Sequence, residues 1–422
     1  MFSLPIYVIM GLYRRAGACS RRNERFCFMQ RRHQGTALQR GMGFARYLCN
    51  TKAKLAIKQN DKQEFEREGI VVKRNFIKVM KAITCCLLSI VFLFFFVRSV
   101  GILMNSHTPK NGINESMYIE INGTRQWINI YGEDLNNPVL LYLHGGPGSA
   151  TSDVDYAFTR KWADVYTVVT WDQRNAGKSY DEDQNSIKLT RDLLLSDAKV
   201  LTEFLLDYLS KDKVAILGHS WGSIYGANLA LEYPEYYSCF IGTGQLIDCQ
   251  ENEVAFKSQA LIWANGDDEL TNLANQLTPD NITMQHFAIK NKILNKCGYT
   301  MFENGRDYNV FITKLFNPNY TISDWIKHFK IDSDVYDEFL ISEEFESFSL
   351  KGNTDYQIPF YNINGDKDYQ TNYQLAQDYF DKVNAPYKQM FIMENMTHGL
   401  LESDSEGFSG IIHQIANNEK NR

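Results

Sequence analysis

The stretch Val214–Gly222, with the sequence VAILGHSWG, decides the fold class of this 422-residue chain. Its first four residues are a short continuous apolar run, which is typical of a strand buried on both faces. A sharp turn follows, in which Ser220 has a glycine two residues away on either side, and a helical pattern then covers Ile224–Glu232. Glycines at these two positions let the chain pass from strand to helix at Ser220, so the serine hydroxyl stands exposed.

Further elements of the same kind lie on both sides of this stretch. The predicted strands are Val139–Leu143, Tyr166–Thr170, Phe240–Gly244, Ile358–Asn364 and Met390–Met393, and the predicted helices are Leu189–Leu209 and Tyr373–Phe380. Before them, Met117–Ile121 and Gln126–Tyr131 flank Asn122-Gly123 and predict a β-hairpin. Buried strands that alternate with helices predict an α/β fold, with a mostly parallel sheet and helices on both faces.

Residues 247–352 interrupt the alternation. They have helical and polar-aromatic character and contain no strand run. We therefore expect a helical cap (lid) inserted after the sixth strand, between two parts of an α/β core at 115–246 and 353–418. Because ligands of open α/β sheets bind at the carboxyl ends of the strands, the cap is expected to cover those ends.

The composition is that of a globular protein, with 44% hydrophobic and 22% charged residues, 27 glycines and 9 prolines. These values exclude collagen-like, low-complexity and wholly disordered chains. The charge is uneven: residues 1–81 carry a net charge of +13 and residues 82–422 carry −19. An acidic domain of this size is unsuited to nucleic acid, so we expect no nucleic-acid partner.

An apolar segment begins where the basic region ends. Ala82–Met104 starts with 16 uncharged residues, and its one charge is Arg98. The segment is long enough to cross a bilayer if Arg98 snorkels to the surface, so we expect a membrane anchor at 73–104 that includes a basic flank. That flank predicts a cytosolic N-terminus and a large domain outside. There are two alternatives. The segment could be a buried core helix, or it could be a cleaved signal sequence that begins at Met80 and leads to a secreted protein.

Residues 1–72 form a basic N-terminal extension. The first fifty residues contain nine arginines, no lysine and one acidic residue, which is the composition of an organellar transit peptide. A disordered cytosolic tail, or an extension upstream of a start at Met80, are the alternatives. The cysteines of the large domain, Cys239, Cys249 and Cys297, show no CxxC spacing and indicate neither a disulfide framework nor a zinc site.

Candidate catalytic groups lie at the predicted strand ends. The Ser220 hydroxyl becomes a strong nucleophile only when a base takes its proton. Of the eight histidines, His398 is the best candidate, because it lies in a loop directly after the last predicted strand. The acid that orients this base should end the preceding strand, where both Asp366 and Asp368 lie.

A glycine-rich loop, His144–Gly148 with the sequence HGGPG, follows strand Val139–Leu143. Small residues there let backbone N–H groups face a developing negative charge, so an amide of this loop and the amide of Trp221 are expected to form an oxyanion hole. Phosphate binding is the alternative for such a loop, but the Gly-Lys-[Ser/Thr] ending of a P-loop is missing.

Three motifs together resemble the proline iminopeptidase family of α/β hydrolases. They are HGGPG at 144–148, WDQR at 171–174 with GKS at 177–179, and GHSWGS at 218–223. The resemblance covers about residues 115–415. The sequence departs from the family pattern at Asn175, where glycine is usual, and at Tyr369, where some members carry a glutamate that binds the substrate's amino terminus. Asparagine tolerates a left-handed backbone better than most residues, so the turn at 175 can persist.

The resemblance implies an α/β-hydrolase fold and a role for each candidate. Ser220 is the nucleophile and His398 is the base, in the chain order Ser, Asp, His that α/β hydrolases share. Asp368 is the acid, because it matches the last position of the family's G-x-x-D. Gly146 and Trp221 supply the oxyanion amides. The resemblance implies no cofactor and no metal, and it says nothing of oligomeric state.

The resemblance also implies a serine aminopeptidase that removes an N-terminal residue, proline by family default, from small peptides or amino-acid amides. Such a substrate has a protonated amine, for which carboxylates of the cap are candidates. They are Glu251, Glu253, Glu343, Glu344 and Glu346. A solvated charge on a helix face is the alternative for each.

Two other functions remain open. A carboxylesterase or lipase-like hydrolase of small or acyl esters needs the same machinery, and a binding protein could keep the fold without catalysis. Dehalogenase and epoxide hydrolase chemistry is disfavoured, because such members of the fold generally have aspartate where this chain has Ser220.

Overall fold

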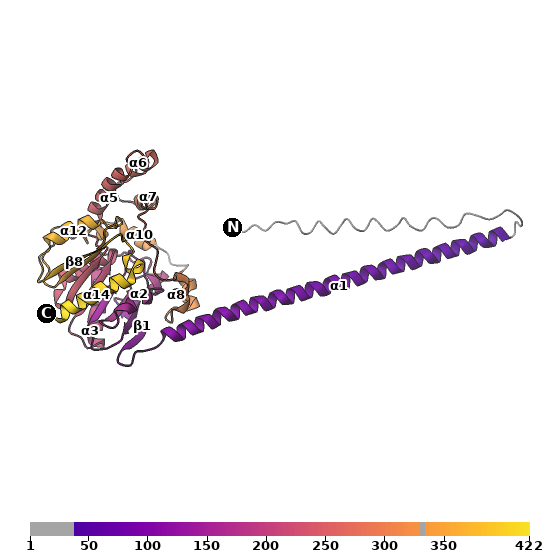
Figure 1. Cartoon of the computed structure of the whole chain (residues 1–422), viewed down its shortest axis with the longest axis horizontal. Coiled ribbons are helices and arrows are strands. Elements are labelled where there is room, and N and C mark those ends of the chain that lie inside the picture. The colour runs from indigo at the N-terminus through magenta and orange to yellow at the C-terminus, as the bar shows by residue number, and fades with distance from the viewer. Residues whose placement is uncertain (1–37, 329–333) are drawn as a thin grey trace. The chain divides into compact units, whose positions relative to one another are not determined.

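The computed structural model describes residues 38–328 and 334–422. It divides into two units, Met1–Ile90 and Val91–Arg422. Helix α1 (Leu38–Asn105) supplies all described residues of the first unit and the start of the second. Every other helix and strand belongs to the second unit (Figure 1).

Helix α1 includes residues 38–72, part of the extension that we expected to be disordered or transit-like. The expectation of disorder is wrong for these residues. The stretch is rich in alanine, lysine, glutamine and glutamate and contains no proline, a composition that favours helix. The transit-like composition of residues 1–37 lies outside the described residues. Among the residues that the structure covers, α1 is the one helix long and apolar enough to cross a membrane.

The second unit is built on an eight-stranded sheet with the order β1-β2-β4-β3-β5-β6-β7-β8. The strands are β1 (Ile113–Ile121), β2 (Thr124–Gly132), β3 (Val139–Leu143), β4 (Thr167–Asp172), β5 (Val214–His219), β6 (Tyr237–Thr243), β7 (Phe360–Gly365) and β8 (Lys388–Met393). The pairings β1·β2 and β2·β4 are antiparallel and all others are parallel. The predicted hairpin is confirmed, with Ile121 opposite Thr124 across the turn.

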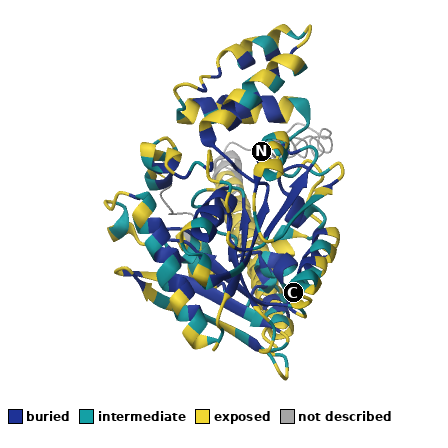
Figure 2. Cartoon of the chain, turned by 90° about the vertical axis from the view of Figure 1, so that its left-hand side faces the viewer, coloured by how far each residue is buried: buried dark blue, intermediate teal, exposed yellow. Residues whose placement is uncertain are grey.

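Alternate residues of the central strands enter two separate cores, as the two-residue period of a strand requires. Leu141 packs with the buried faces of α3 (Arg191–Tyr208), α4 (Trp221–Glu232) and α12 (Tyr373–Lys382) on one side of the sheet. Its neighbour Leu140 packs on the other side, with α2 (Tyr156–Thr159) and α14 (Ser405–Lys420). Figure 2 shows the resulting dark-blue strands between helices whose outer sides are exposed.

A set of helices, which we call the cap, lies between β6 and β7. It consists of α5 (Cys249–Trp263), α6 (Asp268–Asn275), α7 (Met284–Cys297), α8 (Val310–Phe316), α9 (Ile322–His328), α10 (Asp334–Leu340) and α11 (Glu343–Glu346). The helices α5, α6 and α7 share a small core of their own around Phe256, Leu270 and Ile293. After β8 the chain forms the short helix α13 (Leu400–Ser403) and then α14.

The last turns of α1 contact the cap. We expected Arg98 to snorkel toward the membrane surface; that expectation stays a prediction, and the structure shows which groups the side chain binds. The Arg98 guanidinium is buried and donates hydrogen bonds to the carbonyl oxygens of Leu315 (2.9 Å) and Tyr320, at the end of α8 and the loop that follows it. Carbonyl oxygens at a helix C-terminus lack intrahelical partners, so a cation satisfies them well.

A buried ion pair connects the hairpin, the loop after β4 and α3. Arg174 Nε donates to Asp197 Oδ2 (2.6 Å) and its Nη2 donates to Asp197 Oδ1 (2.8 Å). Asn122 and Gln126 of the hairpin donate to the same carboxylate. The two side chains are 3% and 0% exposed, so neither charge can be neutralised by water if its partner is removed.

We therefore expect Asp197→Asn to lower the free energy of unfolding by about 3–5 kcal/mol, because Arg174 is left buried without its counter-charge. Denaturant unfolding of the full chain in detergent measures the change. Glu203→Gln is the matched control, since Glu203 lies on the same helix and pairs with Lys199 at the exposed surface. Equal shifts for the two variants would contradict the assigned role of the buried pair.

Candidate active site

Ser220 stands at the turn between β5 and α4 with φ +58° and ψ −121°, a conformation rarely adopted by residues with side chains. The turn is possible because two glycines allow close backbone contact. A Cβ at Gly218 would lie 2.0 Å from the carbonyl oxygen of Gly222, and a Cβ at Gly222 would lie 2.2 Å from that of Leu143 in β3. The Ser220 amide donates to Thr243 O of β6 (3.0 Å), which fixes the turn to the next strand.

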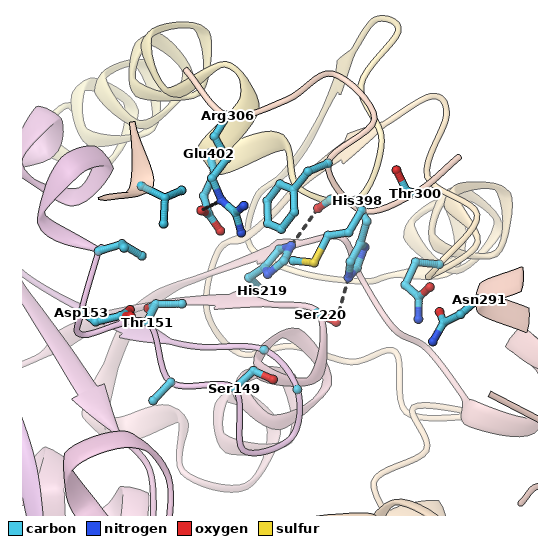
Figure 3. A pocket seen from close by; sticks show the side chains of 18 of the residues that line it. Ser149, Thr151, Asp153, His219, Ser220, Asn291, Thr300, Arg306, His398 and Glu402 are labelled. Atoms are coloured by element: carbon cyan, nitrogen blue, oxygen red, sulfur yellow. Dashed lines mark hydrogen bonds and ion pairs between the residues drawn. The ribbon is translucent and has the colours of Figure 1, made fainter. Parts of the chain in front are cut away.

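The structure brings three of the predicted residues into one hydrogen-bonded chain. The Ser220 hydroxyl lies 2.9 Å from His398 Nε2, and His398 Nδ1 lies 2.7 Å from Asp368 Oδ2 (Figure 3 shows Ser220 and His398). Because a carboxylate only accepts hydrogen bonds, Nδ1 carries the imidazole proton and Nε2 is free to accept from serine. His398 and Asp368 are 3% and 0% exposed, which shields the chain from water.

Asp368 is held by the loop that follows it. Its Oδ1 accepts hydrogen bonds from the amides of Gln370 (3.0 Å) and Thr371 (3.1 Å), and the Thr371 hydroxyl donates to Oδ2. Asp366, which the sequence left as the alternative, accepts instead from the amide of Asn395 (2.6 Å). The structure therefore places Asp368, and not Asp366, against the imidazole.

The glycine-rich loop lies beside the serine. Gly145 approaches so closely that a Cβ there would be 3.1 Å from the Ser220 Cβ, and Gly146 adopts φ +117°. Trp221 is the first residue of α4, and amides of a first helical turn have no acceptor within the helix. The two expected oxyanion donors thus lie in segments next to Ser220, and their roles stay predictions.

The WDQR motif connects these segments. Gln173 Oε1 accepts from the Trp221 indole (3.0 Å), and Gln173 Nε2 donates to His144 O (3.1 Å) in the glycine-rich loop. The Gln173 amide donates to His144 Nε2 (3.2 Å), which requires that nitrogen to be unprotonated. At Asn175 the backbone has φ +55°, so asparagine adopts the left-handed conformation that the motif requires, as predicted.

A cavity of about 610 Å³ opens above Ser220 and His398. Figure 3 shows that the two sides of this cavity differ in the side chains that line them. On one side lie the polar uncharged residues Asn291 and Thr300. On the other lie charged residues: Glu402 Oε2 accepts from Arg306 Nε (2.6 Å), and Asp153 Oδ2 lies 2.6 Å from Lys314 Nζ.

The cap glutamates that we expected to hold a substrate amine do not line this cavity. Glu251 pairs with Lys351 (3.3 Å), and Glu344 accepts from the Arg191 amide (3.0 Å). Glu343 and Glu346 are exposed. For these four residues the outcome matches the alternative, a charge on a helix face, because each is exposed or binds a group that does not line the cavity.

Glu253 is buried and serves a structural purpose. Its carboxylate contacts Lys290 Nζ (2.6 Å) and His286 Nε2 (2.9 Å), and Lys290 also donates to Gln370 O (2.8 Å). The lysine's positive charge opposes the effect of burial, and the pKa of Glu253 lies below its ordinary value. The cluster joins α5 and α7 to the loop that holds Asp368.

Sequence reasoning missed the two carboxylates that do line the cavity, Asp153 and Glu402. A signal was present for each. Asp153 follows the glycine-rich loop by a few residues, and Glu402 lies four residues after His398. Among the residues that the structure describes, no cluster of histidine, cysteine and carboxylate side chains could hold a metal ion.

Two histidines beside the site are neutral at physiological pH. Burial lowers the pKa of His144 to about 4 and that of His219 to about 3. His219 Nε2 donates to the carbonyl oxygen of His398 (2.9 Å), and the two rings lie 4.8 Å apart. A neutral His219 adds no charge next to His398, so it positions the loop without repelling an imidazolium.

Two carboxyls near the cavity shift in the opposite direction. Burial raises the pKa of Asp172 to about 7 and that of Asp155 to about 8. Asp172 Oδ2 accepts from Ser152 (2.7 Å) and from the Lys178 amide (2.7 Å). Both carboxyls therefore hold a proton in the folded chain at mildly acidic pH.

Comparison with known proteins agrees with this architecture. Residues 138–277 match the family model of the alpha/beta hydrolase fold. The chain is 25% identical over 295 residues to probable aminopeptidase YbaC of Bacillus subtilis, covering 68% of this chain and 92% of that one. It is 32% identical over 109 residues to proline iminopeptidase of Xylella fastidiosa, covering 25% and 33%.

One solved structure, a membrane phospholipase A described as a bacterial virulence factor, aligns with 82% of this chain and 98% of its own at a TM-score of 0.52. At 14% identity this likeness concerns the fold alone. With the sheet order and the turn at Ser220, the matches establish an α/β hydrolase. Within that class the chain is similar to relatives named aminopeptidase and proline iminopeptidase, and it is a hydrolytic enzyme.

The raised pKa of Asp155 predicts a pH dependence of stability. Its folded-state pKa of about 8 exceeds the ordinary 3.8, so its contribution is complete below pH 3.8 and is lost as pH rises through 8. The buried histidines act in the other direction, because their contribution is lost as pH falls below 6.5. Between pH 7 and 8 the histidines no longer change the stability, and the deprotonation of Asp155 still lowers it.

We expect the wild-type chain to lose about 1 kcal/mol of stability between pH 7 and 8, and Asp155→Asn to lose much less, because asparagine mimics the protonated carboxyl. Denaturant midpoints at the two pH values measure this. Asp207→Asn, at an exposed position on α3, is the control and should keep the wild-type slope. An unchanged slope in Asp155→Asn would contradict a proton held at Asp155.

Proposed function

We propose that the chain is a membrane-anchored serine hydrolase that removes an N-terminal residue from small peptides or amino-acid amides, with proline as the family default. The observation that supports this most is the hydrogen-bonded chain from the Ser220 hydroxyl through His398 to Asp368 at the floor of a cavity. The curated relatives named aminopeptidase and proline iminopeptidase support the peptidase class.

In the proposed mechanism, Ser220 Oγ attacks the scissile carbonyl while His398 Nε2 takes its proton. Asp368 keeps the imidazole oriented and stabilises its charged form. The amides of Gly146 and Trp221 stabilise the negative charge on the carbonyl oxygen. The tetrahedral intermediate collapses as His398 gives the proton to the leaving amine, and a water molecule then hydrolyses the acyl-enzyme by the same steps.

Glu402 is our candidate for the substrate's protonated amine. Both its side-chain hydrogen bonds, from Arg306 Nε and the Tyr308 hydroxyl, reach Oε2. As far as the described residues show, Oε1 is left for a ligand that enters the cavity. A carboxylate that faces a cavity binds an ammonium group through a charge-assisted hydrogen bond.

A carboxylesterase is the second candidate, and one observation favours it. Glu402 and Asp153, the cavity carboxylates, are each already paired with a base, Arg306 or Lys314. An ester without an amine needs no further carboxylate. Substrates with and without a free amine therefore separate the two functions.

The first helix is proposed as a single-pass anchor. Lys73, Arg74, Lys78 and Lys81 precede its apolar run, and the excess of basic residues on that side supports a cytosolic N-terminus with the hydrolase domain outside. Secretion after signal cleavage is the alternative for the same segment.

For the triad, we expect Ser220→Ala to abolish turnover and Asp368→Asn to lower kcat by about 10⁴-fold, because asparagine cannot hold the productive imidazole tautomer. Asp366→Asn is the matched control and should keep kcat within a few-fold. The assay uses the full chain with Pro-, Ala- and Leu-arylamides, each with a free or blocked amine, and short p-nitrophenyl esters. Activity that survives Asp368→Asn but is lost in Asp366→Asn would overturn the assignment.

In the same assay, Ser220-dependent release from free-amine arylamides alone supports the aminopeptidase. Turnover of esters alone moves the function to the carboxylesterase. A folded chain that turns over none of these substrates contradicts both proposals and favours the binding protein.

For the amine site, Glu402→Gln is expected to raise KM for free-amine arylamides about tenfold, with little effect on blocked amides or esters, because only the charged substrate loses its partner. Glu419→Gln is the matched control. Glu419 also accepts from a tyrosine, Tyr361 (2.6 Å), and pairs with an arginine, Arg422 (3.3 Å), but it does not line the cavity. An equal rise in KM for free and blocked substrates would show that Glu402 does not bind the amine.

A further inference from the structure

The end of α1 is closely joined to α8 and to the start of α9. The Arg98 guanidinium, which donates to Leu315 and Tyr320, also lies 4.7 Å above the ring of Trp325 in α9. One turn later, a Cβ at Gly101 would lie 2.2 Å from the Phe316 ring, so the helix and this side chain are in direct contact. Figure 1 shows α8 beside the C-terminal end of α1.

Helix α9 is also fixed to the sheet domain. Lys178, from the loop after β4, donates to Asn319 O (2.6 Å) and lies 3.6 Å from Asp324 of α9. Its ammonium group stands 3.4 Å from the centre of the Trp127 ring in β2. The segment from α8 to α9 is thus held both by α1 and by the hydrolase core.

The position of Arg98 sets how deep this segment lies. The uncharged run Ala82–Val97 has 16 residues, which span about 24 Å as a helix, whereas a bilayer's hydrocarbon core is about 30 Å thick. A bilayer around α1 therefore needs the whole run and reaches Arg98. Because Arg98 is bonded to α8 and the loop after it, a bilayer that α1 spans would place these elements at the level of its surface.

Helices α8 and α9 expose large apolar side chains at this level. We call Phe311, Ile312, Ile322 and Ile326 the docking face; they are 67%, 41%, 37% and 57% exposed. Ile322 and Ile326 are one helical turn apart and share a side of α9. The last turns of α1, which contact α8, also expose the apolar side chains Val100, Leu103 and Met104. Several large apolar side chains exposed on neighbouring elements are the kind of surface that marks an interaction site.

We propose that the docking face inserts into the interfacial layer of the phospholipid bilayer that α1 spans. The inference rests on the proposed membrane span of α1. Continuity with that span identifies lipid as the occupant, since the face begins where the apolar run of α1 ends. Trp325, stacked on Arg98 beside the face, belongs to the residue type that is enriched at the membrane interface.

The docking face brings lipid close to the active site. Val310 and Lys314 of α8 line the cavity, whereas Phe311 and Ile312 of the same helix are exposed on its outer side. Helix α8 would therefore have lipid on one side and the cavity on the other, and the bilayer would support one wall of the cavity.

Photo-crosslinking in the full chain tests the proposal. p-Benzoylphenylalanine is placed at Phe311 or Ile326, and each protein is reconstituted into phosphatidylcholine vesicles that contain an alkyne-tagged phosphatidylcholine. Ile262 of α5 is the matched control, because it is 67% exposed like Phe311 but lies outside the docking face. Phe92, 71% exposed within the apolar run, is the positive control for the span itself.

We expect tagged lipid on positions 92, 311 and 326 and not on 262. Lipid on 92 alone would overturn the docking face while the anchor stands, and no lipid on 92 would overturn both. Lipid on 262 as strongly as on 311 would show unspecific contact, and a crosslinked pair of chains at 311 without lipid would make the face a self-association surface. Either result overturns the proposal. The readout needs no substrate, so a failed peptidase assay leaves it unaffected.

Discussion

The close approach of α4 to the end of β3 is the constraint on which the site depends. Gly222 touches the carbonyl oxygen of Leu143, and Gly218 touches that of Gly222, so no side chain can be added at either glycine without moving the backbone. This contact holds Ser220 in its strained conformation and places it beside Gly145. The glycine-rich loop, the serine and the start of α4 are therefore positioned by one backbone contact, and strain at Ser220 is maintained by the parallel strands around it.

Charge near this turn is kept low by burial. His144 and His219 are neutral because burial depresses the pKa of each, while Asp155 and Asp172 hold protons at mildly acidic pH because burial raises theirs. Around the proposed triad, the full charges in the cavity wall come as pairs of opposite sign, Arg306 with Glu402 and Lys314 with Asp153. A charged substrate group then meets a preorganised environment in which few other charges compete for it.

The sequence allowed the sheet, the hairpin and the catalytic candidates to be predicted because these depend on local patterns. Buried strands read as apolar runs, Asn122-Gly123 specifies its turn, and the site motifs lie directly at strand ends. The choice between Asp366 and Asp368 came from the family pattern. In the structure the two differ in their partners, because Asp368 contacts the His398 imidazole and Asp366 accepts from the Asn395 amide. The helical state of residues 38–72 was missed because a charged, exposed stretch resembles a disordered one in composition.

The cap could not be predicted residue by residue. Whether Glu253 meets a substrate or Lys290 depends on how α5 packs on α7, and no local pattern encodes that packing. Arg98 is a similar case: beside an apolar run it reads as a snorkelling charge, yet α8 supplies carbonyl acceptors from a segment more than two hundred residues away. Such pairings become visible only when the chain is folded.

The cluster of Glu253 and Lys290 also limits how a substrate can enter. Lys290 and Asn252 both donate to Gln370 O, and the Gln370 amide holds Asp368. If α5 and α7 swung outward, the loop under Asp368 would lose two of its supports, and the imidazole would lose its orientation. The hydrogen bonds to Gln370 therefore tie α5 and α7 to the loop that holds Asp368. Binding of a long molecule that displaced α5 and α7 would therefore also disturb Asp368, so this coupling favours ligands that the cavity accepts with these helices in place.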